Sequence, residues 1–395
     1  MNAAPSHGAQ ASPSGADAPV RARAVRERLP ERGLFAGQAW RISPDPFPLG
    51  SELARELQSL GRVLLQFYRA VNLLYRQSAA GQQPAWVAEL LDRGKPASLL
   101  AWQRDPAFKN DLPRVIRPDV LLTDTGFSIT ELDSVPGGIG LTAWLNETYA
   151  ALAAEKEGTT TPILGGADGM LKGFAGVFGQ AAAVHILVSE ESATYRPEME
   201  WLAGRLGADR FHVRDAAFTG FAEGDAVYRF FELFDLGNVP AAPALFEAAR
   251  ARTVRLTPPP KPLFEEKLLF ALLWNRNLQP FWRRELGESF FRRLLRHVPY
   301  TWVLDPTPLP PQAAFPRLDL TDWAQLKTLS QRERDLILKV SGYSPTAWGA
   351  RGVHLGSDLS VEDWSIAVDE ALWSFVTSPH VLQQYHKPRV VPAHY

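Results

Sequence analysis

Apolar and polar residues alternate with two different periods along the chain, and the changes of period mark its elements. Over residues 51–75, apolar side chains recur every three or four positions behind a serine that can cap a helix, which predicts an amphipathic helix. A second helix is expected over residues 84–93. Between residues 112 and 133, short apolar stretches flank a turn at 124–126, which predicts two antiparallel strands joined as a hairpin.

The rest of the chain predicts alternating helices and strands with two proline-rich interruptions. Further helices are expected over residues 141–155, 196–206, 265–297 and 361–375. Further strands are expected over residues 184–189, 210–213, 226–234, 335–342 and 380–388, although 226–234 also fits a helix. The proline-rich stretches at 257–264 and 305–316 predict boundaries between sub-domains.

This order of elements predicts an α+β protein with several sub-domains, because 395 residues exceed the length that one small core organises. Residues 1–33 are expected to be a disordered tail, since their alanine, serine, proline and arginine bury little apolar surface. The expected segments after it are a helical segment at 34–112, the hairpin with a helix at 113–160, an α/β sub-domain at 161–256, a helical sub-domain at 257–330 and a last unit at 331–395.

The composition narrows the classes of function. A formal charge of −1 gives no overall attraction to nucleic acid or to an anionic membrane, so an anionic ligand needs locally placed cations. The chain has no cysteine, which excludes disulfides, a thiolate nucleophile and Cys-ligated zinc. No apolar run suits a signal peptide or a membrane span, and we expect a cytoplasmic protein that binds neither nucleic acid nor membrane.

Basic and aromatic residues interleave over residues 265–297, a pattern that also occurs on nucleic-acid-binding faces. The near-neutral charge favours the alternative, an amphipathic helix with a solvated basic side. The basic residues of the segment are Lys267, Arg276, Arg283, Arg284, Arg292, Arg293 and Arg296. One or two of these cations are candidates for a phosphate site, and the pattern leaves open which.

The predicted hairpin carries the charged residues with the clearest chemistry. Arg117 and Asp119 are two positions apart and share one face of the first strand, as Glu131 and Asp133 do on the second. The turn brings the two pairs opposite each other, and three carboxylates on one patch repel unless a cation neutralises them. Magnesium takes such carboxylates together with phosphate oxygens, so the hairpin predicts a magnesium site or, alternatively, a charged surface hairpin.

Two weaker features follow further along the chain. Lys339 stands at the end of a predicted buried strand and precedes a glycine-containing loop, an arrangement that resembles phosphate-binding loops without being a Walker A motif. Gln383 and Gln384 lie on the last predicted strand, where alternation directs one of the two side chains inward. Considered alone, either feature also fits an ordinary surface loop or edge strand.

The order of these features resembles that of the circularly permuted ATP-grasp proteins, in particular the synthetase domain of glutathionylspermidine synthase. That family has an R-x-D strand followed about a dozen residues later by E-x-N; here RPD at 117–119 and ELD at 131–133 match, with Asp133 in place of the asparagine. LLWNRNLQP at 272–280 resembles the family's L-S-N-K segment, with Arg276 at the lysine. ILKVSG at 337–342, GARGV at 349–353 and VLQQYHKP at 381–388 resemble its phosphate loop and adenine-contacting hinge.

The resemblance implies an α+β ATP-grasp fold and a ligase that uses ATP and Mg²⁺ to join a small-molecule or peptide carboxylate to an amine through an acyl-phosphate. It implies metal ligands at Asp119, Glu131 and Asp133, and catalytic roles for Arg117 and Lys339. It places nucleotide-binding residues at Lys267, Arg276, Lys339, Gly342, Gly349, Gly352, Gln383 and Gln384. The alternative is an ATP- and Mg²⁺-binding scaffold without turnover, which the aspartate at position 133 favours; the substrates and the oligomeric state stay open.

Overall fold

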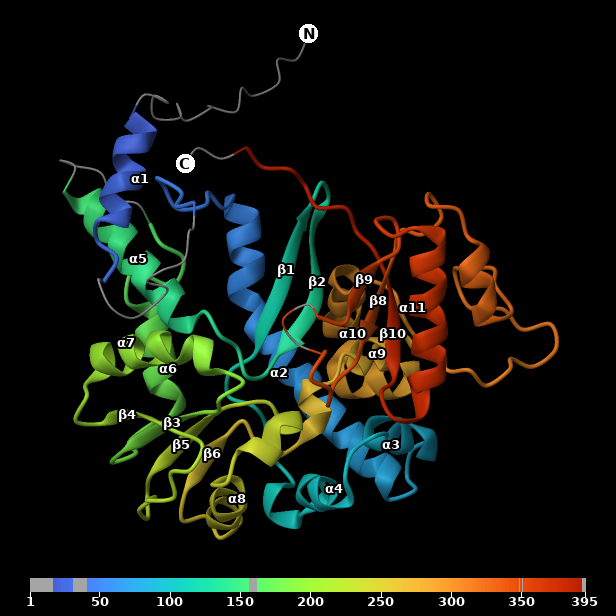
Figure 1. The fold of residues 1–395 in the computed structure, drawn as a ribbon, viewed down its shortest axis with the longest axis horizontal. Helices are drawn as coiled ribbons and strands as arrows, with labels where there is room; N and C mark the ends of the chain where they lie inside the picture. The colour runs from blue at the N-terminus through green and yellow to red at the C-terminus, as the bar shows by residue number, and fades with distance from the viewer. Residues whose placement is uncertain (1–16, 31–40, 156–161, 348, 350, 393–395) are drawn as a thin grey trace.

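The computed structural model describes residues 17–30, 41–155, 162–347, 349 and 351–392. In this part of the chain, a two-stranded hairpin stands at the centre, between a four-stranded parallel sheet and a four-stranded antiparallel sheet (Figure 1). This mixed architecture is compatible with the predicted α+β class. None of the helices found in the described residues is long and apolar enough to cross a membrane.

The central hairpin consists of β1 (Arg117–Thr123) and β2 (Gly126–Asp133), which pair in antiparallel fashion as predicted. Its turn ends at Gly126, whose φ of 140° favours glycine. Phe127 and Ile129 bury the inner face of β2, and the Phe127 ring stacks on the His297 ring with centroids 4.1 Å apart. The hairpin is therefore anchored in a core, and its charged end projects between the two sheets.

Helices supply the core beneath the hairpin. Apolar residues that recur every three or four positions along the first long helix face this core. The core also contains apolar side chains of two helices between residues 268 and 297. The helices of this group are α2 (Ser51–Ala79), α3 (Ala85–Asp92), α9 (Leu268–Trp274) and α10 (Gln279–His297), whereas α4 (Ala97–Arg104) packs through Leu99 against the parallel sheet. The single helix predicted over 265–297 is wrong, because Asn275 leaves the helical region and its side chain accepts a hydrogen bond from the Asn277 N–H.

The parallel sheet has the order β4–β3–β5–β6. Strand β4 pairs with one edge of β3, whereas β5 pairs with its other edge and β6 follows outside β5. Its strands are β3 (Val184–Val188), β4 (Phe211–Arg214), β5 (Ala226–Phe230) and β6 (Arg255–Thr257). All five residues of β3 and of β5 are buried, as expected when helices cover both faces. The helices around this sheet are α5 (Ile139–Ala154), α6 (Gly169–Val177), α7 (Arg196–Leu206) and α8 (Ala242–Arg250).

The antiparallel sheet has the order β7–β10–β8–β9. Its strands are β7 (Thr301–Val303), β8 (Leu336–Val340), β9 (Val353–Leu355) and β10 (His380–Gln384). Helix α11 (Val361–Trp373) covers one face through Trp364 and Val368. The segment 257–330, predicted to be helical, contains β7, whose partner β10 lies about eighty positions away. The opposite face of this sheet meets the hairpin and α9 (Figure 1).

The N-terminal tail differs from the prediction where the structure describes it. Helix α1 (Ala18–Arg26) packs on α5, with Val25 and Trp144 in one apolar cluster. The Arg21 guanidinium also pairs with the Asp45 carboxylate at 2.9 Å. Disorder over the whole range 1–33 is therefore wrong for α1, because these contacts supply the burial that the composition alone did not indicate. Residues 1–16 and 31–33 lie outside the described residues.

Candidate functional site

The hairpin places its four charged residues as the sequence predicts. Arg117 lies opposite Asp133, and Asp119 lies opposite Glu131, with an irregularity in the ladder between Asp119 and Val120. The paired strands thus bring one guanidinium and three carboxylates to the same end of the hairpin. The outer part of this group remains open to solvent, since the side chains of Arg117 and Asp119 are both 43% exposed.

Arg117 neutralises two of these carboxylates. Its Nε donates to Asp119 Oδ1 at 2.9 Å, and its other nitrogens contact Asp133 Oδ2 at 3.1 Å and the Gly137 carbonyl at 3.2 Å. Loss of hydration nevertheless raises the pKa of Asp133 to about 6, against the opposing effect of Arg117. The end of the hairpin therefore carries more negative charge than its own arginine compensates.

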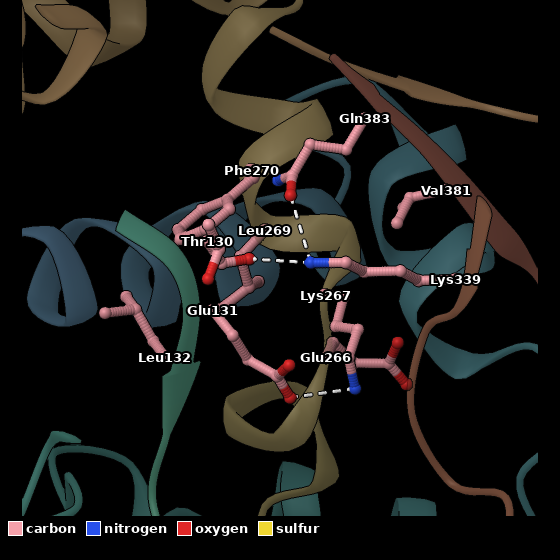
Figure 2. A pocket seen from close by; sticks show the side chains of 10 residues that line it. All are labelled: Thr130, Glu131, Leu132, Glu266, Lys267, Leu269, Phe270, Lys339, Val381 and Gln383. Carbon is pink, nitrogen blue, oxygen red and sulfur yellow. Dashed lines mark hydrogen bonds and ion pairs between the residues drawn. The ribbon is translucent and has the colours of Figure 1, made fainter. Parts of the chain in front are cut away.

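Lys339 reaches the hairpin from β8 (Figure 2). Its Nζ donates to the Thr130 carbonyl at 3.1 Å and to Gln383 Oε1 at 3.0 Å, and the residue is 6% exposed. Burial lowers the pKa of Lys339 to about 8, and nearby Glu131 only partly offsets this effect. A buried ammonium group whose hydrogen-bond acceptors are neutral is a favourable place for an anion.

Lys267 connects the hairpin to the loop that follows β8. Its Nζ lies 2.9 Å from Glu131 Oε1 and donates to the Ala347 carbonyl at 2.6 Å and to the Ser341 carbonyl at 3.4 Å. Figure 2 shows Glu131 and Lys267 pointing toward each other across the same pocket into which Lys339 projects. Lys267 therefore contacts both Glu131, a candidate metal ligand, and the candidate phosphate loop that follows β8.

The start of the loop that follows β8 is fixed by a buried network of an ion pair and hydrogen bonds that the sequence did not indicate. Glu266 accepts a hydrogen bond from the Ser341 hydroxyl and pairs with Lys95 at 2.5 Å, where the two charged side chains are 2% and 1% exposed. Ser341 Oγ also accepts from the Leu268 N–H at 2.9 Å. No motif marks Lys95, because its partner is far away in the chain and only the folded structure brings them together.

The predicted glycines are explained by close packing and by backbone conformation. A Cβ atom on Gly342 would lie 2.5 Å from the Glu265 carbonyl oxygen, and one on Gly352 would lie 2.6 Å from Val340 Cγ1. Gly349 has a φ of 64°, a conformation that favours glycine. Gly342 is thus needed for the loop to pass the chain segment that leads into α9.

The structure brings together Glu131, Lys267, Lys339 and Gln383 around a small pocket with a cavity volume of about 10 Å³. Gln383 is buried and Gln384 is exposed, so the expected inward-facing glutamine is Gln383. Arg276 does not line this pocket but lies beyond the end of α9, at a second pocket, and its expected role at the phosphates stays a prediction.

The three expected metal ligands are in place but not assembled into a cluster. Among the described residues, no group of three or more His, Asp or Glu side chains is arranged to hold a metal ion. Arg117 holds Asp119 and Asp133, whereas Lys267 holds Glu131. A cation at this site would have to take over the neutralising role of these two side chains.

Comparison with known proteins bears on the fold. No protein-family model and no curated protein matches the chain. Among solved structures, the apo form of a glutathione synthetase-like effector (GSS30) from Globodera pallida is similar over 96% of this chain and 82% of that chain, with a TM-score of 0.52 and 12% sequence identity. The chain has a glutathione synthetase-like fold. The finer expectation of a circularly permuted ATP-grasp protein goes beyond this likeness and is a proposal.

Proposed function

We propose that the protein is an ATP-dependent carboxylate–amine ligase of the circularly permuted ATP-grasp type. The observation that carries the proposal is the meeting of buried Lys339 and half-buried Lys267 with Glu131 of the hairpin around one pocket. The glutathione synthetase-like fold supports it as an architecture that a ligase of this type would use.

The charges of the pocket fit a magnesium–nucleotide complex. Lys339 has lost much of its hydration without gaining an anionic partner in direct contact, so phosphate oxygens would stabilise its charged form. Asp119 and Glu131 face each other across the hairpin and would supply oxygen ligands, together with Asp133. When bound, Mg²⁺ would neutralise the charge that develops on the phosphates.

The residues of this chain would act by binding and orientation. A substrate carboxylate oxygen would attack the γ-phosphorus, the bond to the bridging oxygen would break, and ADP would leave. An amine nitrogen would then attack the acyl carbon and lose a proton as inorganic phosphate leaves. Arg117 and Lys339 would balance the charge on the transferred group, and the 341–352 loop, held by Lys267 through Ser341 and Ala347, would exclude water.

A nucleotide-binding scaffold without turnover is the second candidate. It is favoured by the carboxylates of the hairpin, which are already neutralised by Arg117 and Lys267. It is also favoured by the small size of the pocket, whose cavity volume of about 10 Å³ is far below the range of about 300–1,000 Å³ that is usual for small-molecule sites. A triphosphate would therefore require the hairpin and the antiparallel sheet to separate, whether or not chemistry follows.

The discriminating experiment measures ADP release with Mg-ATP against a panel of amino-acid and short-peptide carboxylates combined with primary amines. We expect release that requires both substrates and that falls at least a hundredfold in Asp119→Ala. Asp124→Ala is the matched control, because Asp124 is an exposed aspartate at the turn of the same hairpin. Nucleotide binding without ADP release for any pair would favour the scaffold, and equal loss in both variants would contradict the assigned role of Asp119.

A further inference from the structure

A carboxylate from α7 lies at the amino end of α5, in the region where these two helices lie side by side (Figure 1). Glu198, in the first turn of α7, is completely buried. Its oxygens accept from the backbone N–H groups of Gly140 at 2.7 Å, Gly138 at 3.2 Å and Leu141 at 3.3 Å. The N-cap position of α5 is Gly138, which has no side chain, so Glu198 supplies the cap from another helix.

Glycines allow α7 and the turn before it to approach the start of α5 this closely. A Cβ atom on Gly140 would lie 2.7 Å from Glu198 Cγ, and one on Gly137 would lie 2.3 Å from the Tyr195 ring. Gly138 has a φ of 84°, a conformation that favours glycine. The backbone between the hairpin and α5 is therefore shaped to receive Tyr195 and Glu198.

The surroundings of Glu198 are suited to a charged carboxylate. Burial raises the pKa of Glu198, and the three N–H groups together with Arg117 oppose this effect. The amino end of a helix also carries partial positive charge, and Glu198 lies at this end of both α5 and α7. Removal of the carboxylate would leave buried N–H donors without an acceptor.

One peptide group links Glu198 to the candidate metal site. The Gly138 N–H donates to Glu198, and the Gly137 carbonyl, on the other side of the same peptide bond, accepts from Arg117 Nη1 at 3.2 Å. Because a peptide group is planar, a rotation that breaks one of these bonds also moves the other. Arg117 in turn pairs with two of the three expected metal ligands. A continuous chain of hydrogen bonds and ion pairs therefore runs from α7 to the end of the hairpin.

We propose that Glu198 is a positioning residue for the magnesium site of the hairpin and that it acts through Arg117. By fixing the peptide between Gly137 and Gly138, it would keep the Gly137 carbonyl in place as an acceptor for the guanidinium. Arg117 would then stay oriented toward the phosphates after Asp119 and Asp133 turn to the metal. This inference rests on the proposed function, to which it adds a residue that no motif indicates.

Magnesium titration at fixed ATP, on the full chain, measures the effect on the metal site. We expect Glu198→Ala to weaken Mg²⁺-dependent nucleotide binding about tenfold, as is usual when a group that orients metal ligands is removed. Glu200→Ala is the matched control, because Glu200 is an exposed glutamate of the same helix, and it should change binding less than about twofold. Added formate should restore binding in Glu198→Ala, since a small carboxylate can occupy the place of the missing side chain.

Denaturant titration without nucleotide or metal tests whether Glu198 acts through Arg117. Glu198→Ala and Arg117→Met should each lower the unfolding midpoint. The combined variant should lose less than the sum of the two losses, because both changes release the same peptide group. Additive losses would overturn the proposal. If the unmodified protein binds no Mg-ATP, the proposed function fails, and this comparison alone decides the role of Glu198.

Three results of the magnesium titration would also overturn the proposal. One is unchanged binding in Glu198→Ala, and another is equal weakening by Glu198→Ala and Glu200→Ala, which would indicate a general effect of charge. The third is restoration by formate that is as large in Arg117→Met as in Glu198→Ala, because formate cannot replace a guanidinium group. Circular dichroism establishes that each variant is folded. Glu198→Gln, which keeps the shape of the side chain without its charge, replaces Glu198→Ala in both titrations if the alanine variant does not fold.

Discussion

Nucleotide binding is predicted to take up a proton at alkaline pH, because Lys339 is partly neutral before the nucleotide arrives. Burial lowers the pKa of Lys339 to about 8 in the free protein, below the ordinary lysine value of 10.5. Phosphate oxygens beside the ammonium group would raise this pKa again. At pH 9 about 0.9 of the Lys339 side chains are neutral and must bind a proton, whereas at pH 7 about 0.1 are neutral.

The affinity for ATP should consequently fall by about tenfold for each pH unit above 8, as Lys339 loses its proton in the free protein. Isothermal titration calorimetry in buffers of different ionisation enthalpy measures the number of protons taken up. Lys339→Arg is the control, because a guanidinium group stays charged over this range, and it should show no uptake at pH 9. An absence of uptake at pH 9 in the unmodified protein, or equal uptake in the arginine variant, would refute the assignment of Lys339 to the phosphates.

Three further predictions concern the metal ligands, the buried ion pair between Lys95 and Glu266, and buried Lys261. Glu131→Gln should weaken Mg²⁺-dependent nucleotide binding at least tenfold, measured by Mg²⁺ titration at fixed ATP. Asp133→Asn should change it less than threefold, because Arg117 already pairs with Asp133 and the resembled family has asparagine there; a larger effect of Asp133→Asn than of Glu131→Gln would contradict this order. Lys95→Met should lower the free energy of unfolding by about 3–5 kcal/mol in a denaturant titration, because it leaves Glu266 buried without its ion-pair partner; a loss below about 1 kcal/mol would mean that the pair contributes little. Burial lowers the pKa of Lys261 to about 7, so the folded protein holds fewer protons than the unfolded chain between pH 7 and 10.5. From pH 7 to pH 9 this group alone should raise the free energy of unfolding by ~2 kcal/mol, and Lys261→Met should lack this part of the rise.

The hairpin could be predicted from the sequence because its determinants are local. Alternation of apolar and polar residues sets the faces of its strands, and a short turn sets the register from Thr123 and Gly126 to Val120 and Ile129. The pairing of Asp119 with Glu131 depends in addition on the irregularity between Asp119 and Val120, because the turn register alone would place Asp119 opposite Thr130. The same locality explains α7, whose observed bounds, Arg196–Leu206, equal the predicted range.

Other parts of the fold depend on contacts between distant segments. Strand β7 has only three residues, and its pairing with β10 identifies it as a strand. The break between α9 and α10 depends on one side chain, that of Asn275, hydrogen-bonding to the neighbouring backbone. No periodic pattern records either feature.

The candidate site also has one part that the local sequence predicts and another that depends on contacts between distant segments. Arg117, Asp119, Glu131 and Lys339 lie on strands whose alternation directs them to one region, and Gln383 follows from the same rule. The Lys95–Glu266–Ser341 network joins three segments that no spacing relates. Arg276 lies apart from this region, because the break after α9 carries it to a second pocket beside β7, and its assignment to the phosphates stays a prediction.

A crystal structure of the protein with a non-hydrolysable ATP analogue and Mn²⁺, in which anomalous scattering locates the metal, tests the assignment of the hairpin to the metal and of Lys339 to the phosphates most directly. We expect Mn²⁺ within about 2.0–2.3 Å of carboxylate oxygens of Asp119 and Glu131. We also expect Lys339 Nζ to have turned from the Thr130 carbonyl to a phosphate oxygen. Metal or phosphates bound away from the hairpin, with Lys339 still donating to Thr130, would contradict both assignments.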